Sequence, residues 1–403
     1  MAKKRSEKTR KKISDSLAIF RMGRMWVGVV GLILCVIFIS ISDFASLSLP
    51  HREIEAFVVE RAHVREVITE SLRPDHYLQT VYLGSQLVEI EMRTGEFVGE
   101  RIIMENTLTR FGSLRLQPGM DVLVSVMPGM EQLEVHYMSV YGPSRGPVLI
   151  GAVLLLILGM LIMGRKKGLY AAISLAFTLV VVIYFMISFI IQGYSPVLFA
   201  LITTILTTGF TLCMVGGISR QSLAAIGGTW VGLITAGLIS ALIGNFANVS
   251  GMHLEDAWQM IHTSPPGMYL RVPDLFFAAV IIAASGAVVD AAMSISSSVF
   301  EIKEQSPEIT AKRLYRSGMN IGGDILGANS NTLILAFTGA SLTTMILVVF
   351  FGLPYLRVIN LDIVAIEVIQ SVSATAGMIL AIPATAIFSA LLATRYESEG
   401  IRP

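Results

Sequence analysis

Long apolar runs, separated by short polar segments, dominate the chain. A helix that crosses a bilayer needs about 20 apolar residues. Runs near that length lie at 25–42, 147–164, 169–191, 196–218, 222–244, 275–299, 331–352 and 366–393. The pattern predicts an α-helical polytopic membrane protein with about eight transmembrane helices. Composition agrees, because only 15% of the residues are charged, against about a quarter in soluble domains.

A different pattern fills residues 44–146, where apolar and polar residues alternate as they do in half-buried strands. The clearest runs are 77–83, 87–92, 121–126 and 133–137. Turn-forming residues separate them: Thr94-Gly95, Gln117-Pro118-Gly119 and Pro128-Gly129. Six or seven short strands are expected, which favours a small β-barrel or OB-like domain. A β-sandwich is the alternative.

The lysines set the predicted orientation, because cytoplasmic loops near membrane spans are enriched in Lys and Arg. With eight spans and both termini in the cytoplasm, all nine lysines fall on the cytoplasmic side. They are Lys3, Lys4, Lys8, Lys11, Lys12, Lys166, Lys167, Lys303 and Lys312. The same topology places residues 44–146 and all six histidines outside. The net charge of +1 therefore hides a strong asymmetry and gives no reason to expect nucleic-acid binding.

This topology divides the chain into five segments. They are a basic cytoplasmic N-terminus (1–24), a transmembrane anchor (25–43), the extracytoplasmic β domain (44–146), a seven-helix membrane domain (147–394) and a cytoplasmic tail (395–403). The anchor is expected to stay uncleaved, because Ser42 to Ser46 make a poor signal-peptidase site. In the external loop 245–274, residues 252–262 have the pattern of an amphipathic helix lying on the membrane surface.

Polar residues recur along the run that holds Asp290. Gly286, Asp290, Ser294, Ser297 and Glu301 are spaced by four, four, three and four residues, which places them on one helical stripe. An ionisable group in hydrocarbon is costly and is a functional-site hypothesis by default. The alternative role for Asp290 is to hold helices together by hydrogen bonds.

A second stripe precedes the next run. Asn320, Asp324, Gly327 and Asn331 are spaced by four, three and four residues. The two stripes are expected to face each other and to line a pathway. Glu367, near the outer end of the last run, is a third candidate, although a carboxylate there can also be solvated at the level of the lipid headgroups.

The segment from Ser317 to Tyr355 is too long for one straight span, since 39 helical residues would reach about 58 Å across a core of about 30 Å. Its glycines suggest a broken or re-entrant helix at 317–331, which would line a cavity. The alternative is an interfacial helix before an ordinary span, with Asp324 at the cytoplasmic surface.

Small residues recur every fourth position on a third stretch. They are Gly228, Gly232, Ala236, Ser240 and Gly244. Such a ridge lets a neighbouring helix approach closely, so packing is expected here.

Motifs for several enzyme and cofactor classes are absent from the sequence. It contains no phosphate-binding loop, no zinc-hydrolase His-Glu pair and no dinucleotide fingerprint. We therefore expect no cofactor, no resident metal and no enzymatic activity.

Several segments together resemble the YibE/F-like bacterial membrane proteins. They are residues 285–295 around Asp290, residues 320–327 around Asp324 with Asn331-Thr332-Leu333 after them, and the β domain behind a single anchor. With its external β domain the chain is more similar to the larger, YibE-type members. The resemblance implies a multi-pass protein of the bacterial cytoplasmic membrane and a related, YibF-type polytopic partner. It implies no established activity.

Three functions compete at this point. A transporter or permease would use Asp290, Asp324 and their stripes as a proton or cation relay. A non-transporting scaffold or sensor would bind an envelope partner through the β domain. An intramembrane aspartyl protease would pair the two aspartates, but such enzymes carry Gly-x-Gly-Asp before the second one, and position 321 is Ile.

Overall fold

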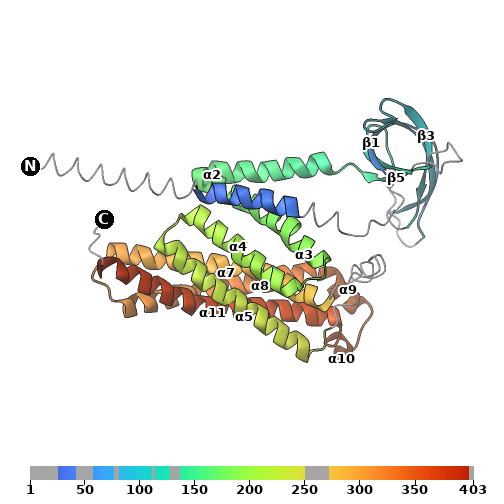
Figure 1. Ribbon diagram of the computed structural model, residues 1–403. Helices are drawn as coiled ribbons and strands as arrows, with labels where there is room; N and C mark the ends of the chain where they lie inside the picture. Colours follow the sequence, from blue (N-terminus) through green and yellow to red (C-terminus); the bar gives the residue numbers. More distant parts are fainter. Residues whose placement is uncertain are drawn as a thin grey trace, which may run out of the picture. The chain divides into compact units, whose positions relative to one another are not determined.

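The computed structural model describes residues 26–41, 58–76, 81–110, 114–127, 137–249 and 272–398. The chain divides into two compact units. One is His51–Gly159, and the other combines Met1–Pro50 with Met160–Pro403. Helix α2 (Gly146–Val180) crosses the division between them (Figure 1).

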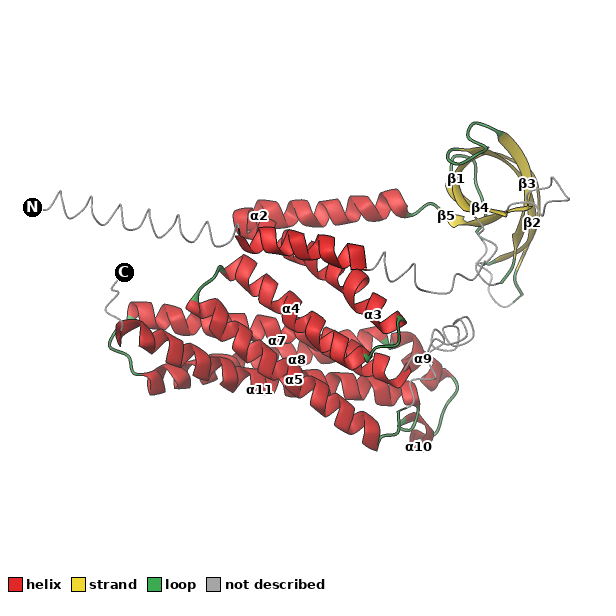
Figure 2. Cartoon of the chain, in the orientation of Figure 1, coloured by secondary structure: helices red, strands yellow, loops and turns green. Residues whose placement is uncertain are grey.

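In the first unit, five antiparallel strands form one curled sheet in the order β3-β2-β1-β4-β5 (Figure 2). The strands are β1 (Val58–Pro74), β2 (Tyr82–Met92), β3 (Arg101–Leu108), β4 (Asp121–Met127) and β5 (Tyr137–Pro143). β1 shifts register between Val64 and Glu66 and again between Val67 and Thr69. Bulges bend a strand and increase its twist. The bent β1 pairs with β2 along most of its length and with β4 through its first residues.

One face of the sheet carries an apolar core. In β2, Val88 and Ile90 are fully buried while Leu87 is exposed, and β4 buries Val122 and Val124 in the same way. This is the period of two expected of a strand with one buried face. The alternation predicted at 87–92 and 121–126 is therefore confirmed.

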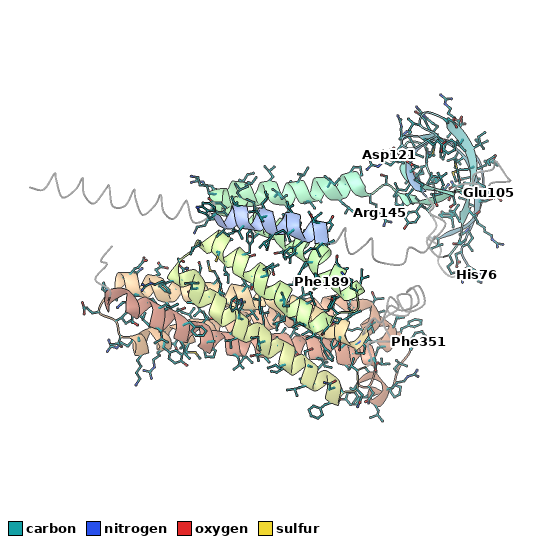
Figure 3. All side chains as sticks on the ribbon, viewed as in Figure 1. His76, Glu105, Asp121, Arg145, Phe189 and Phe351 are labelled. Atoms are coloured by element: carbon teal, nitrogen blue, oxygen red, sulfur yellow. The ribbon has the colours of Figure 1, made fainter. Side chains whose placement is uncertain are left out.

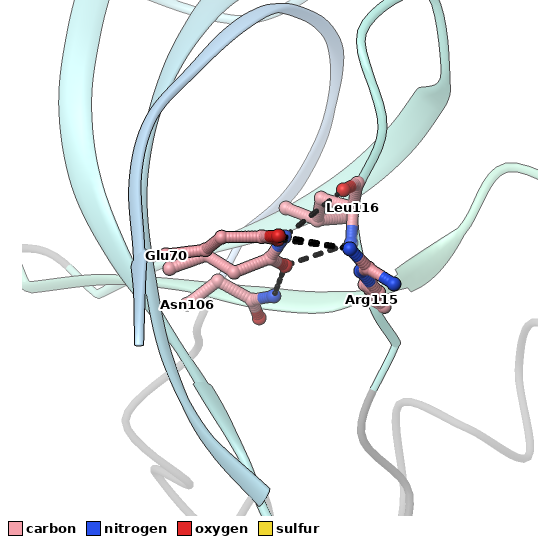
Figure 4. Close-up of polar contacts among 5 residues, drawn as sticks. Glu70, Asn106, Arg115 and Leu116 are labelled. Atoms are coloured by element: carbon pink, nitrogen blue, oxygen red, sulfur yellow. Dashed lines mark hydrogen bonds and ion pairs between the residues drawn. The ribbon is translucent and has the colours of Figure 1, made fainter. Parts of the chain in front are cut away.

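A buried polar network fixes the segment before β4 against the sheet (Figure 4). The Gln86 side-chain amide donates to the Leu116 carbonyl oxygen at 3.1 Å, and its carbonyl accepts from the Leu116 N–H at 2.9 Å and from Asn106 at 3.1 Å. Arg115, next to Leu116, forms an ion pair with Glu70 at 2.9 Å. Gln86 is completely buried, so water cannot replace its hydrogen bonds to Leu116. These bonds hold the segment before β4 in place.

The described residues form five strands, whereas the sequence pattern predicted six or seven. The expected strand at 133–137 lies outside the described residues except for Tyr137, and so do residues 77–80 of another expected run. Alternation is also incomplete in the strands that the pattern missed. β1 is interrupted by its bulges, and β3 turns the polar Asn106 toward the core.

The chain reverses direction within α2. Arg165 has φ of +48° and ψ of −122°, which no helical residue adopts. A Cβ at Gly168 would lie 1.8 Å from the carbonyl oxygen of Met160, although eight residues of straight helix span about 12 Å. α2 is therefore two helices joined by a tight turn, in agreement with the separate apolar runs predicted at 147–164 and 169–191.

Most of the remaining chain is helical and apolar. After α2 come a π-helical segment η1 (Val181–Ile187), α3 (Ser188–Ile191), α4 (Pro196–Gly216), α5 (Arg220–Phe246), α7 (Val272–Gln305) and α11 (Asp362–Ser398). Five helical stretches of the described chain are long and apolar enough to cross a membrane, and a bent pair of helices makes a sixth. A shorter apolar helix, Trp26–Ile41, precedes the sheet in sequence. By length and composition this is a multi-pass membrane protein.

Glycines bring α5 into close contact with α11 and α7. A Cβ at Gly228 would lie 1.8 Å from the Thr385 hydroxyl oxygen, and one at Gly232 would lie 2.7 Å from Cγ1 of Val288. Both glycines belong to the ridge predicted from small residues at every fourth position, and all five ridge residues are buried. The predicted packing face is confirmed.

The break predicted at 317–331 is wrong, because α8 (Ala311–Ala340) runs through this segment without interruption. Two of the glycines that suggested a break instead allow α11 to approach. A Cβ at Gly322 would lie 2.2 Å from Cγ2 of Ile382, and one at Gly318 would lie 3.0 Å from Cβ of Ala386.

The bend occurs at Ser341, nearly three helical turns beyond the predicted segment. α8 and α9 (Leu342–Phe350) meet at Ser341 with an angle of 61°, and the short helix α10 (Tyr355–Val358) follows. The external loop 245–274 is described only up to Val249 and from Val272 onward, so the helix expected at 252–262 lies outside the described residues.

Candidate functional site

Asp290 lies about half way along α7, 18 residues after Val272 and 15 before Gln305. One face of this helix is held by the core, where Val288 is fully buried among residues of α8 and α11. Asp290 and Ser294 are on another face, and both are exposed. The predicted polar stripe therefore exists as a surface that the described chain does not cover.

α8 has the same division into two faces. Its buried residues are Leu314, Gly318 and Gly322. Asn320, Asp324 and Asn331 are exposed on the other side. Within the described chain these three side chains make no hydrogen bond or ion pair.

The two faces meet at one open cavity of about 540 Å³. Its lining comes from α7 and α8 alone, and consists of Asp290, Met293, Ser294, Asp324, Ile325, Ala328 and Asn329. Because Asp290 lies mid-way along α7 and shares the cavity with Asp324, the second carboxylate is at the same level and not at a helix end.

The cavity includes three of the residues predicted as pathway residues, namely Asp290, Ser294 and Asp324. The predicted residues Ser297, Asn320, Asn331 and Glu367 do not line it. Sequence reasoning missed the other four lining residues. Met293, Ile325 and Ala328 carry no polar signal, and Asn329 lies off the stripe spacing.

The structural setting of Glu367 on α11 differs from that of the two aspartates. Its side chain is half-buried, and its Oε2 atom is buried without a hydrogen-bond partner among the described residues. The same is true of the Ser373 hydroxyl oxygen, further along this helix. An unpaired buried oxygen is costly, so Glu367 does not have the setting of a freely solvated carboxylate in the isolated chain.

A comparison with known protein families shows the family to which the chain belongs. The model of the YibE/F-like protein family matches residues 152–395, which is 244 of the 403 residues. The chain belongs to the YibE/F-like family. No curated protein and no solved structure gives a significant match. The family match contains α7, α8 and the whole cavity lining, whereas the helix Trp26–Ile41 and the five strands precede it.

In this YibE/F-like protein the cavity presents two carboxylates, one hydroxyl and one carboxamide. No hydrogen bond or ion pair joins Asp290 to Asp324 in the described structure. Groups of three or more His, Cys, Asp or Glu side chains that could hold a metal are not found in the described residues. The site is suited to binding a proton or a hydrated cation. Carboxylate oxygens accept protons, and carboxylate, hydroxyl and amide oxygens bind cations or the water around them.

Proposed function

We propose that this protein is a membrane transporter or permease in which Asp290 and Asp324 carry protons or cations. One observation carries the proposal: a carboxylate half way along the apolar helix α7 and a second carboxylate from α8 line a single open cavity. A charged side chain at that depth is rare and typically marks an ion or substrate pathway.

The open cavity supplies what the chemistry requires. The cavity has a volume of about 540 Å³, so water can enter it and hydrate a carboxylate. Each aspartate can then bind or release its proton or cation. Ser294 and Asn329 add a hydroxyl and an amide that can hold intermediate waters or the ion itself. Binding at one aspartate and release at the other would form one step of a relay.

The proposed topology has eight spans, with both termini in the cytoplasm and residues 44–146 outside. The reversal at Arg165 supports it by separating two spans next to Lys166 and Lys167. The pair α8–α9 then serves as one bent span. The apolar helix Trp26–Ile41 would be the described part of the first span.

The proposal also includes the location of the protein and its partners. We place it in the bacterial cytoplasmic membrane, in contact with lipid and with a related YibF-type polytopic partner. The curled sheet, whose edge strands β3 and β5 contact each other, would close into an OB-like barrel outside the membrane. We propose no enzymatic activity, since the aspartates do not contact each other and Ile321 replaces the glycine of the protease motif.

Ion flux into liposomes tests this function. Purified protein is reconstituted, a pH or cation gradient is imposed with a membrane potential, and flux is measured for wild type, Asp290→Asn and Asp324→Asn. Both variants should reduce flux to the level of empty vesicles, because the amide keeps the shape of the side chain but cannot carry its charge. Glu304→Gln is the matched control, since it removes an exposed carboxylate of α7 outside the cavity. Unchanged flux in both aspartate variants would exclude the relay.

The outer face of the sheet favours a second candidate function, that of a scaffold. Glu66 of β1 lies directly opposite Glu89 of β2, a like-charge pair that destabilises a sheet. Neither carboxylate has an ion-pair partner in the described structure. Next to Glu89, Ile103 of β3 is 60% exposed, and Glu105 projects from the same strand (Figure 3).

This acidic and apolar face would fit a basic envelope protein. In the scaffold function, Glu89→Lys with Ile103→Lys would abolish co-purification of a partner while leaving flux unchanged. The transport function predicts that flux depends on Asp290 whether or not a partner is captured.

A further inference from the structure

The exposed residues of α7 change in character at Asp290. Between Pro273 and Val289 none of them has a polar side chain, and they are Pro273, Ala279, Ala283 and Gly286. From Asp290 to the end of the helix all of them are polar or charged, and they are Asp290, Ser294, Ser297, Glu301, Glu304 and Gln305. Hydrocarbon tolerates the first group, whereas the second group is solvated well only by water. The cavity therefore lies at a boundary along α7, with a polar surface on one side of it alone.

Two close contacts fix the register between α7 and α8. A Cβ at Gly322 would lie 3.3 Å from Cδ1 of Ile295, and one at Gly318 would lie 3.0 Å from Cγ2 of Val299. A step of four residues forward along α7 is thus matched by a step of four residues back along α8. The two helices are antiparallel, and the loop 306–310 joins them at one end.

α8 continues the polar surface toward that loop. By the register, Asn320 of α8 is at the level of Ser297 of α7. Ser297 is three residues from Ser294 of the cavity, a rise of about 4.5 Å, and Asn320 is four residues from Asp324, about 6 Å. Every exposed residue of α8 between the loop and Gly322 is polar, and these are Lys312, Arg313, Arg316 and Asn320. Polar side chains of both helices therefore lead from the cavity to the loop.

The opposite side of the cavity has no such pair of surfaces. There α8 exposes polar and apolar residues together, with Asn331 and Thr332 next to Ile334 and Leu335. α7 exposes only Gly286, Ala283 and Ala279 along the same stretch. An ion that moved in this direction would lose water without gaining ligands from α7.

We infer that a proton or cation reaches Asp290 and Asp324 from the loop end of α7 and α8, along Ser297 and Asn320. What moves rests on the proposed function, but the one-sided access of water does not. In the proposed topology the loop is cytoplasmic, so the structure is the state open to the cytoplasm. Release on the other face then requires a second conformation, since the apolar half of α7 does not hydrate an ion.

The charges at the loop end are mixed. Carboxylates and cations alternate there, as Glu301, Lys303, Glu304, Glu308, Lys312, Arg313 and Arg316. Lys303 also donates hydrogen bonds to the carbonyl oxygens of Pro307 and Ile309, which holds the loop against the end of α7. Because neither sign prevails at this entrance, selection for a cation is left to Asp290 and Asp324.

Labelling of single cysteines from each face of the membrane tests the route. In a background with Cys35→Ser and Cys213→Ser, a membrane-impermeant methanethiosulfonate reagent is added to right-side-out and to inverted membrane vesicles. Ser306→Cys, at an exposed loop position, identifies the face that carries the loop. Ser297→Cys should react from that face at least about tenfold faster than the matched control Ala283→Cys, because the reactive thiolate forms in water and not in apolar surroundings. Equal rates, or reaction of Ser297→Cys from the opposite face only, would overturn the inference.

A second pair of positions covers a failure of the Ser297 variant to fold. Asn320→Cys should also react from the loop face, whereas Leu335→Cys, exposed on α8 beyond the cavity, should not. Reaction of these two at the same rate would contradict one-sided access. Labelling of Ser297→Cys and Asn320→Cys in a protein without ion flux would support the access route and count against transport alone. Flux in a protein whose two cysteines do not react would count against the route alone.

Discussion

Gly322 of α8 lies so close to Ile382 of α11 that a Cβ on the glycine would be 2.2 Å from the isoleucine Cγ2. Its neighbour Gly323 is turned by about 100° around the helix, and a Cβ there would meet no atom within 4 Å. One position therefore sets the distance between two helices, and the other leaves the helix surface open.

We expect Gly322→Ala to destabilise the membrane domain and Gly323→Ala to leave it unchanged or slightly stabilised. Overpacking at the first position costs about 1–3 kcal/mol, whereas an open helical site gains up to about 1 kcal/mol from replacing glycine. Thermal unfolding in detergent measures both. Equal midpoints for the two variants would show that α8 and α11 are not in close contact at this level.

Filling the cavity should block transport without changing any charge. Ala328 is exposed and lines the cavity, so Ala328→Phe would occupy much of the space between Asp290 and Asp324. Liposome flux should fall by at least about tenfold, a change worth about 1.4 kcal/mol in barrier height. Ala336→Phe is the control, because Ala336 is exposed on α8 outside the cavity. Full flux in Ala328→Phe would mean that the ion does not pass through this cavity.

In the sheet, Gln86→Ala should release the segment that precedes β4. The change leaves the Leu116 N–H and carbonyl without their partner and removes the acceptor of Asn106. Buried unpaired groups cost about 1–3 kcal/mol each. Hydrogen exchange of the full chain should show faster exchange in residues 114–120. Thr107→Ala, an exposed neighbour on β3, should not change it, and identical exchange in the two variants would contradict the role of Gln86.

The stability of the sheet should depend on pH through Glu91. The Arg65 guanidinium donates a hydrogen bond to this carboxylate and lowers its pKa below the ordinary value of 4.5, and Arg93 and Arg101 act in the same direction. A lowered pKa stabilises the folded form above pH 4.5, and this contribution is lost as the pH falls through the folded value. The protection of β1 and β2 amides from hydrogen exchange, taken relative to the intrinsic exchange rate at each pH, should therefore fall below pH 4.5 in wild type but less so in Glu91→Gln. A wild-type profile retained by the variant would exclude this ion pair as the cause.

Periodicity was sufficient to predict the two polar faces, but long-range contacts decided the rest of the membrane site. The sequence places Asp290, Ser294 and Asp324 on the faces that line the cavity because every α-helix has the same residue spacing per turn. The role of Gly322 was mistaken for a break, since its partner Ile382 is 60 residues away and the local sequence holds no trace of it. Asn329 and Ala328 were missed for the same reason: only the neighbouring helix makes them part of a cavity.

The sheet shows a comparable limit. Alternation revealed β2 and β4 because most of their buried residues are apolar, among them Val88, Ile90, Val122 and Val124. β3 was not identified because Asn106 is buried for its hydrogen bond to Gln86, a partner on another strand. A polar residue satisfied by a distant partner has the same local pattern as a surface position.

The aromatic contacts of the helix Trp26–Ile41 have a consequence for biosynthesis. Phe38 packs against Phe177 and lies 4.6 Å from the ring centroid of Phe185, so its partners are synthesised at least 139 residues later. At about 5–20 residues per second, the first helix waits roughly 7–28 s for them while all five strands are made. Throughout that interval lipid must cover the helix face that later contacts the aromatic side chains of residues 177 and 185. The order of synthesis therefore constrains how apolar this helix has to be, in addition to the final packing.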